Sequence, residues 1–183
     1  TYFDRCEIAG PGFINFFLNR RFFGDVLKDV HRLGKEYGRS DYGKGKKIMV
    51  EFVSANPTGP MHMGNARGGA LGDCLASVLD AAGYNVWREF YVNDAGNQIE
   101  KFGLSLSVRY QQLFAGENAP ELPEDSYHGE DILDLAKAYA DENGDSLMEK
   151  TEEERRAALV AFALPRNIAK MKADMKKYRI EYD

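Results

Sequence analysis

The chain has 183 residues, of which 44% are hydrophobic and 12% aromatic, and it carries a formal net charge of −5. This composition allows one substantial buried core, but it excludes a surface devoted wholly to nucleic acid, because neutralising phosphates requires clustered Lys and Arg. No apolar run approaches the ~20 residues that span a bilayer and the first residues carry no secretory signal, so we expect a cytoplasmic globular protein without a membrane partner.

The first predicted elements are a hairpin and a helix. Two short apolar stretches, residues 6–9 and 13–18, flank the turn sequence Gly10-Pro11-Gly12, which predicts a pair of strands. Apolar residues then recur at helical spacing over residues 24–37, and Gly38 is expected to end this helix.

A polar, glycine-bearing stretch at residues 39–47 follows the helix, and we expect it to separate two domains. The predicted division is residues 1–24 as the end of a small N-terminal α/β domain, 25–45 as a linker helix and loop, and 46–183 as the first part of a larger domain. Because the chain begins without a Met, we expect it to be part of a longer protein.

A strand, loop, helix and strand come next. Residues 48–53 form a nearly continuous apolar run, which is typical of a central parallel strand covered on both faces. A loop rich in Pro and Gly at residues 54–65 leads into a helix at 66–82, which Gly83 should close, and a second strand is predicted at 86–92. This βαβ order predicts an α/β fold with a Rossmann-like parallel sheet.

The small residues of this helix are predicted to have structural roles. Gly68, Gly69 and Gly72 are expected to let the helix pack closely on the sheet. Cys74 falls on the apolar side, where we expect a buried, reduced side chain. Cys6 and Cys74 lack the spacing of a disulfide framework or a zinc site.

The remaining chain is predicted to be a helical insertion. Asn93 or Asp94 should cap a helix that ends near Phe114, and residues 117–127 should form an exposed connection. A capping box of Thr151 and Glu154 should start the last helix, with a possible kink at Pro165. The last two helices are predicted at residues 130–141 and 152–178.

The loop after the first strand carries the chemistry. It leaves the carboxyl end of a strand and enters a helix N-terminus, where open α/β sheets bind ligands and backbone N–H groups favour anions. His62 could donate hydrogen bonds to phosphate oxygens, and Gly64 would let a nucleotide approach the backbone. Structural alternatives remain open, because Glu51 could be a strand-end carboxylate paired with a lysine and Asn56-Pro57 is itself a turn signal.

This loop resembles the first signature of class I aminoacyl-tRNA synthetases, His-x-Gly-His, in the extended form of the arginyl enzymes. Asn65 stands where the second His is usual, and the class tolerates Asn there. Three other stretches resemble the arginyl family in the same order: residues 9–16, 91–98 and 127–130, of which the first resembles the end of its N-terminal tRNA-contacting domain. The signature comprises Ala55, Asn56, Pro57, Thr58, Gly59, Pro60, Met61, His62, Met63, Gly64 and Asn65.

The resemblance implies a role for each matching residue. Ser54 and Asn56 would hold the amino group of arginine together with His62, and Glu51 would receive the guanidinium, a planar cation that carboxylates match. His62, Gly64 and Asn65 would face ATP, with His62 and Asn65 as the catalytic candidates.

The implied function is that of a bacterial-type arginine–tRNA ligase, which forms arginyl-adenylate from arginine and ATP and transfers the arginyl group to tRNA(Arg). Mg²⁺ would arrive with ATP, no protein metal site is expected, and the full-length enzyme is expected to be a monomer. The 183 residues contain no lysine-rich second signature, so we expect this stretch alone to be inactive.

Two other functions stay open from the residues. A small nucleotidyltransferase shares the sheet and a His-x-Gly-His motif, and a non-catalytic module could bind a nucleotide or RNA. The basic cluster at residues 170–179 could approach tRNA or form a solvated helix face.

Overall fold

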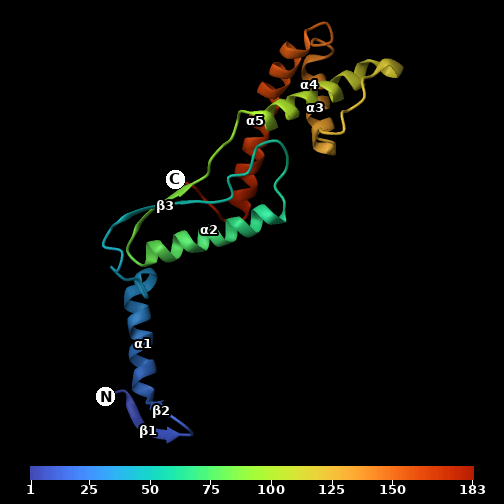
Figure 1. Ribbon diagram of the computed structural model, residues 1–183. Helices are drawn as coiled ribbons and strands as arrows, with labels where there is room; N and C mark the ends of the chain where they lie inside the picture. Colours follow the sequence, from blue (N-terminus) through green and yellow to red (C-terminus); the bar gives the residue numbers. More distant parts are fainter.

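The computed structural model describes residues 1–183, except for the side chain of Glu117. The molecule is elongated, with a hairpin and one helix at one end, a small parallel sheet in the middle and a group of helices at the other end (Figure 1). In chain order the elements are β1 (Phe3–Ala9), β2 (Phe13–Leu18), α1 (Arg20–Leu33), η1 (Gly34–Glu36), β3 (Lys47–Glu51), α2 (Met63–Ala81), β4 (Asn85–Glu89), α3 (Asn97–Phe114), η2 (Gly116–Asn118), α4 (Glu130–Asn143) and α5 (Glu152–Lys177).

The predicted hairpin is confirmed, but the bounds predicted for the helix after it are wrong at both ends. β1 and β2 pair antiparallel, with Ile8 opposite Ile14. α1 begins at Arg20 because the Asn19 side chain caps it, accepting a hydrogen bond from the Phe22 N–H at 3.2 Å. It ends before Gly34, which adopts φ 54°, a conformation that glycine adopts without strain.

The polar stretch after α1 packs against the C-terminal end of α2. The Arg39 Nη1 atom lies 3.0 Å from an Asp80 Oδ2 atom, and this hydrogen bond lowers the pKa of the Asp80 carboxyl. The Ser40 N–H also donates to the Ala81 carbonyl at 2.9 Å. These bonds therefore fix the segment that connects α1 to the sheet against the end of α2.

The predicted βαβ unit is confirmed. β3 and β4 pair in parallel, with Met49 opposite Trp87, and α2 connects them. The expectation that the strand is covered on both faces is wrong within this chain. Ile48 and Val50 are half-buried, whereas Met49 is 64% exposed and Trp87 is 52% exposed on the opposite face.

α2 contacts the sheet through glycine. A Cβ atom on Gly72 would lie 2.2 Å from Cγ of Phe52, and one on Gly69 would lie 2.8 Å from Cδ1 of Ile180. Gly72 thus packs on the residue that directly follows β3, as predicted, whereas Gly69 packs on the segment after α5 rather than on a strand, and Gly68 has no such neighbour within 4 Å. The helix begins at Met63, earlier than predicted, and Gly83 follows its end with φ 85°.

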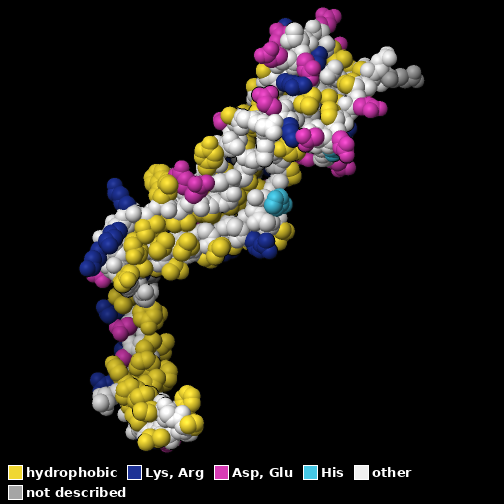
Figure 2. Space-filling view, viewed as in Figure 1, with side chains coloured by type: hydrophobic (Ala, Val, Ile, Leu, Met, Phe, Trp, Pro, Cys, Tyr) yellow, Lys and Arg dark blue, Asp and Glu magenta, His cyan; other side chains and the backbone are white. Residues whose placement is uncertain are grey.

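The apolar side of α2 faces outward, so the prediction that Cys74 is buried is wrong. Cys74 is exposed, and its neighbours Leu71 and Val78 are 73% and 66% exposed. Hydrophobic side chains gather over this helix (Figure 2). The helical spacing identified an apolar face but not which side of the helix the sheet would cover. Both cysteines are free thiols.

The helical group, α3 to α5, holds the main core, built from Phe102, Leu106, Tyr110, Ile132, Ala136, Leu147, Leu159 and Ala163. Within it, the Tyr110 hydroxyl donates to the Gly144 carbonyl at 2.7 Å and accepts from the Leu147 N–H at 3.2 Å. Its buried hydroxyl therefore holds the connection between α4 and α5.

The helix starts in this group were predicted with mixed success. The capping box of Thr151 and Glu154 is confirmed at the start of α5. The proposed caps Asn93 and Asp94 are wrong, because α3 begins at Asn97 after Gly96, whose φ is 85°. Residues 117–127 are also not wholly an exposed connection, since Tyr127 packs edge-on against Phe102, with ring centroids 6.3 Å apart.

None of the helices in the described part of the chain combines the length and the apolar character needed to cross a bilayer. The predicted division into residues 1–24, 25–45 and 46–183 stays a prediction, and α1 runs across its first boundary.

Candidate active site

The loop between β3 and α2 begins with a strained turn. Val53 and Ser54 adopt φ values of 67° and 41°, a region that L-residues, and β-branched ones above all, rarely occupy. The Ser54 N–H donates to the Phe52 carbonyl at 3.0 Å. The backbone thus leaves β3 abruptly after Glu51, two residues earlier than predicted, and turns at the carboxyl end of the strand.

The helical group holds this loop in place. The Asn167 side chain, on α5, donates to the Pro57 carbonyl at 2.9 Å. Pro57 and Thr58 are buried at this junction. Because α3 and α5 are packed together by their own core, they give the loop a rigid support.

Ser54 and Asn56 both bond to the segment that follows β4. The Tyr91 N–H donates to Ser54 Oγ at 3.1 Å. The Asn56 side-chain NH₂ donates to the Oε1 atom of Gln98, in the first turn of α3. Two segments that resemble the arginyl family, the signature loop and residues 91–98, therefore lie against each other.

His62, Gly64 and Asn65 form the N-terminus of α2. The Gly64 N–H donates to His62 Nδ1 at 3.1 Å, and the His62 N–H donates to Asn65 Oδ1 at 3.0 Å, which makes a capping box. Since Nδ1 accepts a hydrogen bond, the proton of the neutral imidazole lies on Nε2. A Cβ atom at position 64 would lie 2.9 Å from the His62 ring, so a larger residue there would displace that ring.

Two carboxylates end the paired strands. Glu51 and Glu89 are register partners in the parallel sheet, so their side chains project from the same face. Glu51 is exposed, and Glu89 accepts a hydrogen bond from the Trp87 indole at 2.6 Å. Glu51 was predicted from the sequence as a site residue, whereas Glu89 was not, and no role was predicted for Gln98. The second strand was predicted over residues 86–92, so Glu89 fell inside it, and only the observed end of β4 places this carboxylate beside Glu51.

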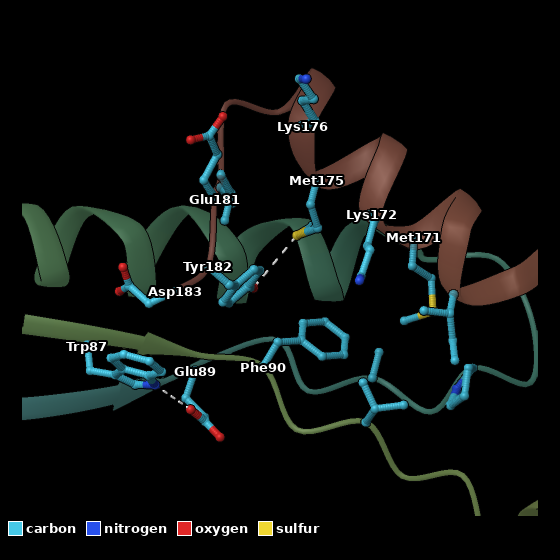
Figure 3. A pocket seen from close by; sticks show the side chains of 15 residues that line it. Trp87, Glu89, Phe90, Met171, Lys172, Met175, Lys176, Glu181, Tyr182 and Asp183 are labelled. Carbon is cyan, nitrogen blue, oxygen red and sulfur yellow. Dashed lines mark hydrogen bonds between the residues drawn. The ribbon is translucent and has the colours of Figure 1, made fainter. Parts of the chain in front are cut away.

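A cavity of about 690 Å³ lies beside the loop, lined by Ala55 and Pro57, by the end of β4 and by α5. Figure 3 shows Trp87 and Glu89 on one side of it and Met175 and Tyr182 on the other. Tyr182 stacks on Phe52 with ring centroids 4.7 Å apart. Burial raises the pKa of the Tyr182 phenol to about 12, with a smaller contribution from Asp73.

A smaller cavity of about 220 Å³ is lined by Gly59, Pro60 and Met61 with residues of α4 and α5. Glu51, Asn56 and His62 line neither of these two cavities. The structure thus brings Ser54 and Asn56 together with residues 91–98, and His62 together with Gly64 and Asn65, but neither of these two cavities contains all of them.

Metal ligands are not gathered at the loop. In the part of the chain that the structure describes, no group of three or more His, Cys, Asp or Glu side chains is arranged to hold a metal ion.

Comparison with known proteins places these motifs in a family. The sequence profile described as "tRNA synthetases class I (R), catalytic domain" matches residues 29–181. The chain belongs to this arginyl class I synthetase family. The Rossmann-like fold class predicted from the βαβ order and the signature loop is thereby confirmed.

Related proteins are similar to this chain over its whole length. It is 62% identical over 183 residues to an arginine–tRNA ligase of Acetivibrio thermocellus and 63% identical over 183 residues to one of Caldanaerobacter subterraneus. A solved structure from Campylobacter jejuni, described as a putative arginyl-tRNA synthetase, covers 91% of this chain with a TM-score of 0.77 and 32% identity, and 36% of that chain is matched.

The chain covers 32% of each of these two ligases, and so spans about a third of their length. The roles of Glu51, Ser54, Asn56, His62, Gly64 and Asn65 in binding ATP or arginine stay predictions.

Proposed function

We propose that this chain is the part of an arginine–tRNA ligase that carries the first signature of its catalytic domain. The observation that carries the proposal is the identity of 62% over the whole chain with an arginine–tRNA ligase, combined with a signature loop that turns at the carboxyl end of β3. The small nucleotidyltransferase has no support from these comparisons. A non-catalytic module derived from a synthetase is an outcome that the experiment below can distinguish.

The proposed reaction needs no side-chain nucleophile. A carboxylate oxygen of arginine attacks the α-phosphorus of ATP, which enters with its own Mg²⁺, and the bond to pyrophosphate breaks. The terminal hydroxyl of tRNA(Arg) then attacks the carbonyl carbon of arginyl-adenylate, and AMP leaves. Catalysis then depends on positioning the substrates and on stabilising the charge on the phosphate.

His62 is suited to donating a hydrogen bond to a phosphate oxygen of ATP. It stands at the N-terminus of α2, an end where the unpaired N–H groups favour anions. Because Nδ1 is held by the Gly64 N–H, Nε2–H is the donor left for a phosphate oxygen. Asn65 supports this orientation by accepting the His62 N–H. We propose that Asn65 acts on ATP mainly through this capping box.

Arginine would lie between the ends of the strands and the loop. Ser54 Oγ and Asn56 Oδ1 are oxygen acceptors suited to an ammonium group, and Glu51 is suited to a guanidinium. Glu89, its register partner, adds a second negative charge on the same face. A lysine ammonium could not use the same planar fork of carboxylate contacts.

The proposed enzyme acts in the cytoplasm as a monomer, with tRNA(Arg), arginine and ATP as its partners. These proposals rest on the similarity to bacterial arginine–tRNA ligases.

The test uses the full-length protein that contains residues 1–183. We expect arginine-dependent exchange of pyrophosphate into ATP and formation of arginyl-tRNA(Arg), both measured with tRNA present, and no product with lysine. Glu51→Ala should weaken arginine binding in calorimetry by about tenfold to a hundredfold, as expected when a hydrogen bond to a charged group is lost. A folded full-length protein that binds tRNA without ever forming arginyl-tRNA would instead be a non-catalytic module.

A further inference from the structure

Gln98 makes a contact that the proposed reaction does not yet use. Its Oε1 atom accepts a hydrogen bond from the side-chain NH₂ of Asn56. The two residues are 42 positions apart in the sequence, and they belong to the signature loop and to the first turn of α3. Asn56 is half-buried and Gln98 is exposed.

This contact decides which end of the Asn56 amide is free. An Asn side chain presents an NH₂ donor and a carbonyl acceptor, and a half-turn about its last bond exchanges them. With the NH₂ bonded to Gln98, the Oδ1 atom is left over, and no hydrogen-bond partner for it occurs among the described residues. An α-ammonium group only donates hydrogen bonds, so it can be bound by Oδ1 and is repelled by NH₂.

The helical group holds the part of α3 from which the Gln98 side chain extends. The neighbouring residue Ile99 is buried, and Phe102, one turn further along α3, is fully buried in the core. The same segment also supplies the Tyr91 N–H that donates to Ser54 Oγ at 3.1 Å. A donor of this segment thus orients the Ser54 hydroxyl, and an acceptor of it orients the Asn56 amide.

We propose that Gln98 is a positioning residue for binding of the amino-acid substrate: its Oε1 atom holds the Asn56 amide so that Oδ1 faces the α-ammonium group of arginine. This inference rests on the proposed function, in which Asn56 binds that group. Gln98 itself need not touch the substrate. The helical insertion would then take part in amino-acid recognition through one side-chain amide.

The test compares two ligands on the full-length protein by calorimetry: arginine and 5-guanidinopentanoic acid, which is arginine without its α-amino group. Gln98→Met keeps the length of the side chain but removes the acceptor. Gln98→Glu keeps an acceptor and cannot donate. Asn97→Ala, at the exposed neighbouring position, serves as the matched control.

We expect Gln98→Met to weaken arginine binding about tenfold, the effect of one misplaced hydrogen bond, and to leave binding of 5-guanidinopentanoic acid unchanged. Gln98→Glu should restore arginine binding to within about twofold, and Asn97→Ala should match the unsubstituted protein. The KM for ATP should not change in any variant.

Three results would overturn the inference: equal weakening of both ligands by Gln98→Met, which indicates a merely structural role; unchanged arginine binding in Gln98→Met; or no recovery in Gln98→Glu. A failure of the unsubstituted protein to bind arginine would be distinct, because it would remove the proposed function itself.

Discussion

His62 combines a structural role with the proposed catalytic one. Its Nδ1 atom accepts the Gly64 N–H and so caps α2, while Nε2 remains for a phosphate. Asn, Ser and Asp are the usual residues at such a position, because a short side chain reaches the first N–H groups easily. A histidine there therefore suggests that its second ring nitrogen is the reason for its presence.

Two substitutions separate these roles. His62→Asn keeps an acceptor for the helix cap but removes Nε2–H, so stability should change little while the rate of adenylate formation in the full-length protein falls about 100-fold or more. His62→Ala should show the same loss of rate and also lose about 1 kcal/mol of stability, because the cap is gone. Pyrophosphate exchange and urea denaturation measure the two effects. Equal rates for His62→Asn and the unsubstituted protein would contradict the phosphate role.

At the scale of elements, α2 packs closely on Phe52, the residue after β3, because Gly72 carries no side chain. Gly72 lies against the Phe52 ring, whereas Gly68, about one helical turn earlier, has no neighbour within 4 Å of a Cβ position. The same helix thus offers one glycine that packing requires and one that it does not.

The two glycines should respond in opposite directions. Gly72→Ala should destabilise residues 1–183 by about 1–3 kcal/mol, because the new methyl group overlaps the Phe52 side chain near its Cβ. Gly68→Ala should stabilise the chain by about 0.5–1 kcal/mol through its higher helix propensity. Equilibrium denaturation followed by circular dichroism measures both, and stabilisation by both substitutions would show that helix propensity alone governs α2.

At the scale of the molecule, exposed apolar side chains gather on two surfaces. One is the outer side of α2, and the other is formed by the hairpin and α1 (Figure 2). No residue of α1 is buried. Contiguous apolar patches of this kind are typical of surfaces that another part of a protein covers. The curated relatives are about three times as long as this chain.

Residues 1–183 alone should not charge tRNA above background. The proposed reaction needs a grip on the triphosphate and further contacts to the guanidinium, and the 183 residues contain no lysine-rich second signature to supply the first. The assay follows labelled arginine into tRNA(Arg), with the full-length protein as the positive control. Charging by the 183 residues at a rate near that of the full-length protein would refute this expectation.

The sequence by itself determined the features that depend on residues close together along the chain. The βαβ order, the capping box at Thr151 and the turn at residues 10–12 follow from spacings of a few positions, over which backbone and side chain interact directly. The signature loop was also predictable, because its residue types and their order are local. The family was predicted on those grounds, and the profile match over residues 29–181 confirmed it.

Only the tertiary structure decided which surfaces meet. Apolar spacing could not say that Cys74 would face outward, because periodicity reports an apolar face and not what covers it. The bonds from Asn56 to Gln98 and from Asn167 to Pro57 join residues 42 and 110 positions apart. Such contacts depend on how whole elements pack, and no local pattern of residues encodes that packing.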